Sequence, residues 1–198
     1  MCRLIETIRL LDGRVENSEY HQQRIDRSFA EFFKNSLPIN LNNSLTDWEL
    51  PSTGLHKIKL VYDHEVRSIE VTPYEQKKIQ KLKIVHADYI SYSFKFEDRA
   101  EIEKFYAQRG QCDDIIIVKN NFITDASFAN LVFKKGSQWV TPKTYLLNGT
   151  LRQSLLDKKI IIEDNITIND LVRYQKVKLI NALLQFASPE IDVSQVVL

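Results

Sequence analysis

A series of short apolar segments, closely spaced and separated by turns, dominates the chain between residues 114 and 141. The first segment, Ile115–Val118, is apolar on both faces, which is typical of a central strand in a sheet. The pairs Asn120–Asn121 and Lys135–Gly136 are turn formers and separate it from the segments that follow. Those segments cover residues 122–124, 130–133 and 138–141. The spacing predicts a β-rich region in this part of the chain.

A candidate binding site lies in the overlapping stretch of residues 122–152. Asp125 sits between two short strands, and Gly149 follows an apolar segment and precedes a predicted helix over residues 150–158. The N-terminus of a helix presents backbone N–H groups, which bind phosphate well. A carboxylate can pair with a cationic ring nitrogen. The layout therefore predicts a site for a flat cationic ring at one end and a phosphate at the other.

Length and composition place the chain among ordinary globular proteins. Its 198 residues fit one large domain or two small ones, with 43% hydrophobic and 27% charged residues. A net charge of +1 gives no electrostatic case for binding nucleic acid or an anionic membrane surface. No run is long enough to span a membrane and no signal peptide is evident, so we expect a cytoplasmic location. The two cysteines and four histidines lack the spacing of metal ligands, so we expect no metal site.

The first part of the chain is predicted to hold strands and one longer helix. Residues 5–11 and 15–17 flank Asp12–Gly13 and predict a hairpin. Ser18 is the expected N-cap of a helix that runs to about Lys34. Four residues of this helix recur at three- and four-residue steps and should share one face: His21, Arg24, Ile25 and Ser28.

Further elements are expected along the chain, and a change of domain near its middle. The predicted elements are a short helix at 46–50, strands at 57–63, 68–74 and 81–86, and a helix at 99–108. Residues 89–95 show no clear period, and we interpret them as the crossing between two domains. The expected domains are residues 1–90 and residues 91–198.

Five blocks in order resemble the class IV aminotransferases, the fold-type-IV enzymes that use pyridoxal 5′-phosphate (PLP). The blocks are Ile5–Arg9 with Asp12–Arg14, His21–Arg24 with Ser28, Lys95–Arg99, Asp113–Asn130, and Thr141–Pro142 with Gly149–Arg152. One block alone is weak, but five in the right order are a strong signal. The resemblance implies an α+β fold like that of D-amino acid aminotransferases, with a small N-terminal α/β domain and a β-rich C-terminal domain that carries the PLP lysine. It also implies a homodimer and a small-molecule substrate.

The resemblance assigns cofactor roles to individual residues. Lys95 matches the catalytic lysine that binds PLP covalently, and burial would favour the neutral, nucleophilic amine that this requires. Asp125 matches the acid that pairs with the pyridine nitrogen, although the family usually has glutamate there. Arg24 matches the phosphate-binding arginine, whose fork suits phosphate geometry. The other implied cofactor contacts are Arg99, Gly149, Thr150, Leu151, Asn181 and Ala182.

Ordinary structural interpretations of the same residues stay open. Lys95 and Arg24 could be solvated surface residues, and Asp125 and Gly149 could be plain turn residues. His21 is expected to have a structural role. The occurrence of all four candidates in one chain favours the cofactor interpretation over a degenerate scaffold without cofactor.

The resemblance leaves two reactions open. One is the lyase reaction that converts 4-amino-4-deoxychorismate to 4-aminobenzoate and pyruvate in folate biosynthesis. The other is transamination of an amino acid, of the branched-chain or D-amino acid type. Thr7 matches a lyase threonine that assists proton transfer, and Arg99 and the Asn181–Ala182 pair also resemble the lyases. The family loop that recognises substrate carboxylates is missing after residue 59, and Arg67 is only a weak replacement.

Overall fold

The computed structural model describes residues 2–198 and divides into two compact units. The first unit extends to Gln76 and also includes Phe94–Asp98, and the second comprises Lys77–Ser93 and Arg99–Leu198. The chain therefore passes between the units after residues 76, 93 and 98. This division differs from the boundary expected near residue 90, and it groups Lys95 with the first unit instead of the second. The cause is local, because the backbone around Lys95 pairs with a strand of the first unit.

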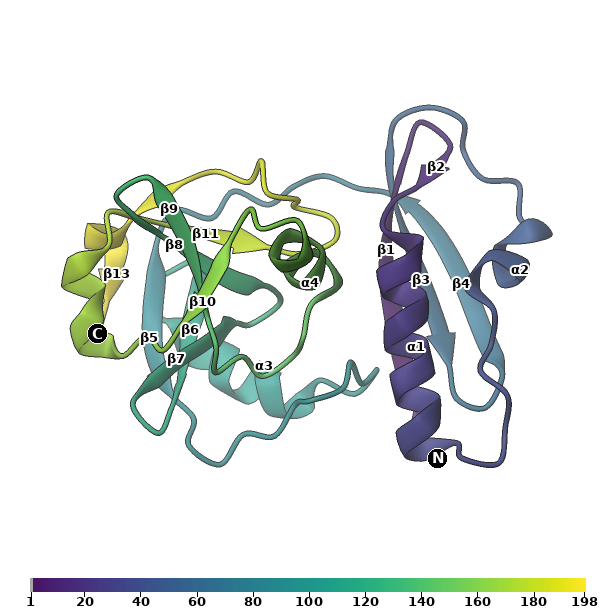
Figure 1. Cartoon of the computed structure of the whole chain (residues 1–198), viewed down its shortest axis with the longest axis horizontal. Helices are drawn as coiled ribbons and strands as arrows, with labels where there is room; N and C mark the ends of the chain where they lie inside the picture. Colours follow the sequence, from purple (N-terminus) through teal and green to yellow (C-terminus); the bar gives the residue numbers. More distant parts are fainter. Residues whose placement is uncertain (1) are drawn as a thin grey trace. The chain divides into compact units, whose positions relative to one another are not determined.

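The first unit is an antiparallel sheet with a helix across one face (Figure 1). The strand order is β2 (Arg14–Val15), β1 (Leu4–Leu11), β3 (Leu55–Tyr62), β4 (Val66–Pro73). The helices are α1 (Ser18–Phe32) and α2 (Leu41–Thr46). The predicted hairpin, the long helix and the two following strands are confirmed.

The alternation of side chains along β1 determines which of them face α1. The apolar residues at alternate positions are fully buried and belong to the core of this unit: Leu4, Ile8 and Leu10. Ile25 and Phe29 of α1 belong to the same core. Since successive strand residues point to opposite faces, Glu6 points toward α1 and Thr7 points to the other face.

Two local predictions in this unit are wrong. Ser18 is the first residue of α1, and the N-cap position is taken by Asn17, which has φ 52° and makes no side-chain capping bond. The short helix expected at 46–50 lies earlier, at Leu41–Thr46, where the side chain of Asn40 accepts a hydrogen bond from the Asn43 N–H. That capping bond explains where the helix begins.

The second unit is built on a nine-stranded sheet among the described residues. The strand path is β10-β9-β8-β7-β6-β5-β13, and β11 pairs with β8 and with β12. The strands are β5 (Leu82–His86), β6 (Asp114–Lys119), β7 (Phe122–Ala126), β8 (Asn130–Lys135), β9 (Gln138–Pro142), β10 (Ile162–Asp164), β11 (Lys176–Ile180), β12 (Ile191–Asp192) and β13 (Val196–Val197). The helices are α3 (Ala100–Tyr106) and α4 (Thr150–Asp157), with 3-10 turns at Ala107–Arg109, Ile168–Arg173 and Val193–Gln195.

The predicted β-rich character of this region is confirmed. Strand β6 is buried along nearly its whole length, as expected for an apolar central strand. Asn120 and Asn121 turn the chain into β7 with φ of 49° and 68°.

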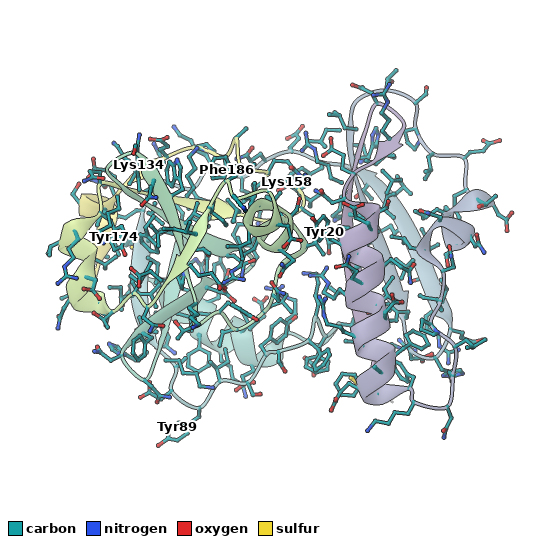
Figure 2. The ribbon with its side chains drawn as sticks, in the orientation of Figure 1. Tyr20, Tyr89, Lys134, Lys158, Tyr174 and Phe186 are labelled. Carbon is teal, nitrogen blue, oxygen red and sulfur yellow. The ribbon has the colours of Figure 1, made fainter. Side chains whose placement is uncertain are left out.

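Figure 2 shows Tyr89 pointing away from the chain, and its side chain is 98% exposed. Within the described residues, no helix has both the length and the apolar character needed to cross a membrane.

Candidate active site

Glu6 is the centre of a buried cluster in the first unit, which we call the Glu6 cluster (Glu6, His21 and Arg24). Arg24 Nε donates to Glu6 Oε1 at 2.8 Å, and Arg24 Nη2 donates to Glu6 Oε2 at 2.5 Å. Such a two-point pair fixes the plane of the guanidinium. Glu6 is fully buried and Arg24 is only 6% exposed. The predicted phosphate-binding arginine is therefore not a solvated surface residue, and a carboxylate of β1 sets its orientation.

His21 is the second partner of Glu6. Burial lowers the pKa of His21, so the neutral imidazole donates from Nδ1 to Glu6 Oε2 at 2.5 Å. Burial alone would raise the pKa of Glu6, but Arg24 and His21 outweigh it and bring that pKa down to about 2. Glu6 therefore stays ionised around neutral pH, and the cluster holds one ion pair and one neutral hydrogen-bond donor.

Lys95 lies on a segment that is hydrogen-bonded to β1. The Ile5 N–H donates to the Lys95 carbonyl at 2.9 Å, and Phe96 forms an antiparallel bridge with Leu4. The Lys95 side chain is half-buried, and its charge adds to the effects that lower the pKa of His21. The structure therefore places the segment that carries the predicted lysine beside β1, the strand that carries Glu6.

Thr7 lies on the opposite face of the same sheet. It is half-buried and pairs in register with Lys59 of β3. The alternation of β1 separates its side chain from the Glu6 cluster, which lies on the α1 side. The structure thus places Thr7 one residue from Glu6 along the chain but on the other face of the strand.

Asp125 is the centre of a second buried group, in the second unit. Its Oδ1 accepts from Asn130 Nδ2 at 2.8 Å, and its Oδ2 accepts from the N–H groups of Leu146 and Leu147, each at 2.9 Å. Burial raises the pKa of Asp125 to about 6, and these donors, with Arg152, offset only part of the effect. Asp125 is therefore no plain turn residue, because it fixes the loop that leads to α4.

Asn130 and Gly149 complete this group, which we call the Asp125 network (Asp125, Asn130 and residues 146–149). Asn130 Nδ2 also donates to the Leu147 carbonyl at 2.9 Å. A Cβ atom on Gly149 would lie 2.0 Å from Asn130 Oδ1. The φ of Gly149 is −68°, which any residue adopts, so glycine is required here for space and not for conformation. Sequence reasoning did not single out Asn130, although it falls in one of the matching blocks.

Helix α4 begins directly after Gly149. Thr150 and Leu151 are both buried, and Leu151 packs in a core cluster with Val132 and Leu155. Arg152 joins α4 to the neighbouring strands β9 and β10: its Nη2 donates to the Pro142 carbonyl at 3.0 Å and pairs with Glu163. The N-terminus of α4 is therefore held in a fixed position, and helix N-termini in general favour anions.

Arg99 and Asn181 meet at the turn between β7 and β8. Arg99 Nη2 donates to the Ser127 carbonyl at 2.8 Å, and Asn181 Nδ2 donates to the Phe128 carbonyl at 3.3 Å. Asn181 Oδ1 also accepts from the N–H groups of residues 183 and 184, and the neighbouring Ala182 is buried. In the structure these predicted cofactor contacts support the turn that follows Asp125.

The chain is similar to several known proteins. The model of the amino-transferase class IV family matches residues 93–188. An uncharacterized protein of Haemophilus influenzae is 37% identical over 186 residues, which are 92% of this chain and 98% of that protein. A crystal structure from Haemophilus somnus, of a protein provisionally named 4-amino-4-deoxychorismate lyase, is 35% identical with a TM-score of 0.88 and covers 94% of this chain and 98% of its own. A Mesorhizobium loti structure, provisionally named an amino-acid aminotransferase, shares the fold at 19% identity, with a TM-score of 0.78 and full coverage of both chains.

These similarities confirm the resemblance and the α+β fold expected from the sequence. Among the described residues, no group of three or more potential metal ligands lies close enough to hold an ion. With a relative at this identity over almost its full length, the chain belongs to the class IV aminotransferases, the family of PLP-dependent enzymes that its five sequence blocks indicated.

Proposed function

We propose that the chain is a PLP-dependent lyase that converts 4-amino-4-deoxychorismate to 4-aminobenzoate and pyruvate, the step that supplies folate biosynthesis. The observation that carries the proposal is the joint presence of Lys95 beside the Glu6 cluster and of Asp125 in a network that leads to the N-terminus of α4. The 35% identity to a protein provisionally named as such a lyase, over 98% of its length, favours this reaction. On family grounds we also propose a homodimer in the cytoplasm.

The residues present fit the chemical groups of PLP. Arg24 supplies a buried guanidinium and α4 supplies a helix N-terminus, and both suit a phosphate. The methyl group of any larger residue at position 149 would fill the space beside that helix end. Asp125 is a buried carboxylate whose hydrogen-bond donors are uncharged, which suits a protonated ring nitrogen. Lys95 supplies the amine for the aldehyde.

Each residue then has a defined task in the reaction. PLP, when bound, would withdraw electrons from the carbon that loses its proton. The amine of Lys95 would take that proton from the substrate, and the family resemblance, not a contact in the structure, assigns the hydroxyl of Thr7 to assist the transfer. Asp125 would keep the ring nitrogen of bound PLP positively charged, and Arg24 and the first turn of α4 are the groups that we assign to its phosphate. The bond between the ring and the oxygen of the enolpyruvyl group would then break, the ring would become aromatic as 4-aminobenzoate, and the released enolpyruvate would take up a proton to become pyruvate.

Product analysis tests the proposal. The protein with PLP should convert 4-amino-4-deoxychorismate to equal amounts of 4-aminobenzoate and pyruvate, and Lys95→Ala should lose this activity. Formation of pyridoxamine phosphate from PLP and an amino acid, without formation of 4-aminobenzoate, would instead establish the transaminase. A protein whose absorbance does not change on addition of PLP would be the cofactor-free scaffold.

A further inference from the structure

We infer that Asn130 is the positioning residue of the phosphate end of the site and acts through Asp125 and Gly149. The inference rests on the proposed function, because it assigns the phosphate of PLP to the N-terminus of α4. It adds a residue whose described side-chain contacts are with Asp125, Leu147 and Gly149. Asn130 is the first residue of β8, and it touches both β7 and the loop before α4.

The side-chain nitrogen of Asn130 donates two hydrogen bonds. Its Nδ2 donates to Asp125 Oδ1 at 2.8 Å and to the Leu147 carbonyl at 2.9 Å. The other oxygen of Asp125 accepts from the N–H groups of Leu146 and Leu147. Asn130 therefore closes a ring of hydrogen bonds that joins the buried carboxylate to the N–H and the carbonyl of the same loop residue.

The close approach of Gly149 shows how tightly the loop fits against this amide. A methyl group at position 149 would meet Asn130 Oδ1 at 2.0 Å and Asn130 Cγ at 3.2 Å. A shift of the Asn130 side chain away from this contact would disturb the two hydrogen bonds that its Nδ2 donates. Asn130 and Gly149 therefore determine together the path of the chain into α4.

Precise placement of the first turn of α4 matters for phosphate binding. A displacement of about 1 Å at a binding group is enough to weaken a site strongly. Asn130 contacts Asp125, the proposed partner of the ring nitrogen, and it abuts Gly149, the last residue before the proposed phosphate site. It thus couples the ring end to the phosphate end through groups that the structure shows in contact.

A comparison of two ligands separates positioning from general loss of structure. We expect Asn130→Ala to weaken PLP binding by about tenfold or more, and to weaken binding of pyridoxal, which lacks the phosphate and depends on the ring end alone, by a clearly smaller factor. Asn165→Ala, an exposed asparagine of the same unit, is the control and should bind both ligands like the parent. Equal losses for both ligands, or no loss for PLP, would overturn the inference. Asn130→Ser provides the same comparison if the alanine variant does not fold.

A double-variant cycle tests the contact with Gly149. Gly149→Ala alone should lower the melting temperature of the protein without PLP and weaken PLP binding. In an Asn130→Ala background the same change should have little further effect on either, because the obstructing amide is gone. Additive effects would show that the two residues are not coupled. If the parent protein does not bind PLP, the proposed function is overturned as well. If the parent binds PLP but the Asn130 variants do not behave as expected, only the inference about Asn130 is overturned.

Discussion

The two units each bury a carboxylate that belongs to our proposed set of site residues, and the two carboxylates differ in their partners. Glu6 in the first unit is fully buried and faces a guanidinium, and its pKa falls to about 2. Asp125 in the second unit is almost as buried but accepts hydrogen bonds only from uncharged groups, and its pKa rises to about 6. Since burial is nearly equal, the charge of the partner decides the direction of the shift.

The difference also separates two kinds of site residue. Glu6 has its counter-ion within the chain, so it serves to hold Arg24. Asp125 is hydrogen-bonded but has no cation among its hydrogen-bond donors, which leaves it suited to a positively charged ring nitrogen. This contrast supports the roles that we propose for Arg24 and Asp125.

The largest expected effect comes from removing the charge of Glu6. Glu6→Gln leaves the guanidinium of Arg24 buried without its counter-ion, so the free energy of unfolding should fall by about 3–5 kcal/mol. Glu16→Gln, which breaks a more exposed pair with Arg9, should cost only about 0–1 kcal/mol. Urea unfolding measures both, and a loss below about 1 kcal/mol for Glu6→Gln would contradict the ion-pair account.

A fall in pH should reduce the stability that Glu6 contributes and increase the stability that Asp125 contributes. The folded-state pKa of Glu6 lies below its ordinary value of 4.5, so its contribution to stability is present above pH 4.5 and is lost as the pH falls toward about 2. The folded-state pKa of Asp125 lies above its ordinary value of 3.8, so its contribution is present below pH 3.8 and is lost as the pH rises through about 6. Each amounts to about 3 kcal/mol at about 1.4 kcal/mol per pKa unit.

Unfolding of the protein without cofactor, measured against pH, checks these signs. Relative to the parent, Asp125→Asn should remove a decrease of stability between about pH 4 and pH 6. Glu6→Gln should remove a decrease below pH 4.5. The difference in unfolding free energy between parent and variant should change with pH in opposite directions for the two variants. A change in the same direction for both would show that the two environments do not differ as described.

A smaller effect is expected on the affinity for PLP when Arg24 becomes lysine. Lysine keeps the charge but has no fork, so it cannot hold Glu6 at two points and a phosphate at once, and PLP affinity should fall by about tenfold to a hundredfold. Arg27→Lys, on the exposed side of the same helix, is the matched control. Binding titrations with PLP and pyridoxal decide the case, and unchanged PLP affinity would remove Arg24 from the phosphate site.

The smallest effect on stability is expected at Thr7. Thr7→Val keeps the shape of a β-branched strand residue on the face away from the core, so the free energy of unfolding should change by less than about 1 kcal/mol. The turnover number should nevertheless fall by about tenfold or more, since the hydroxyl that we propose assists proton transfer is lost. Thr72→Val, on the same face of the neighbouring strand pair, should change neither quantity. Full activity of Thr7→Val would remove its catalytic role.

The sequence predicted those parts of the site that depend on local periodicity. The three- and four-residue spacing of His21, Arg24, Ile25 and Ser28 indicated one helix face, and the structure buries all four. The burial of Glu6 could have been found in the same way, because Glu6 shares the alternate positions of Leu4, Ile8 and Leu10 on its strand.

Other features depend on tertiary contacts that no local pattern reports. Asn130 meets the carbonyl of Leu147 across 17 positions of the sequence, and Arg99 meets Ser127 across 28. The segment around Lys95 joins the first unit because it pairs with β1, far away in the chain. Local signals also failed at two helix starts: Asn17 takes the N-cap position of α1 in a left-handed conformation, and the side chain of Asn40 caps α2 before the residues where a helix was expected.

The covalent attachment of PLP tests the central claim most directly. The protein is incubated with PLP and reduced with borohydride, and the modified peptide is identified by mass spectrometry. We predict one PLP group per chain on Lys95, with no stable modification in Lys95→Ala. Absence of the adduct, or its attachment to another lysine with Lys95→Ala labelled like the parent, would contradict the account.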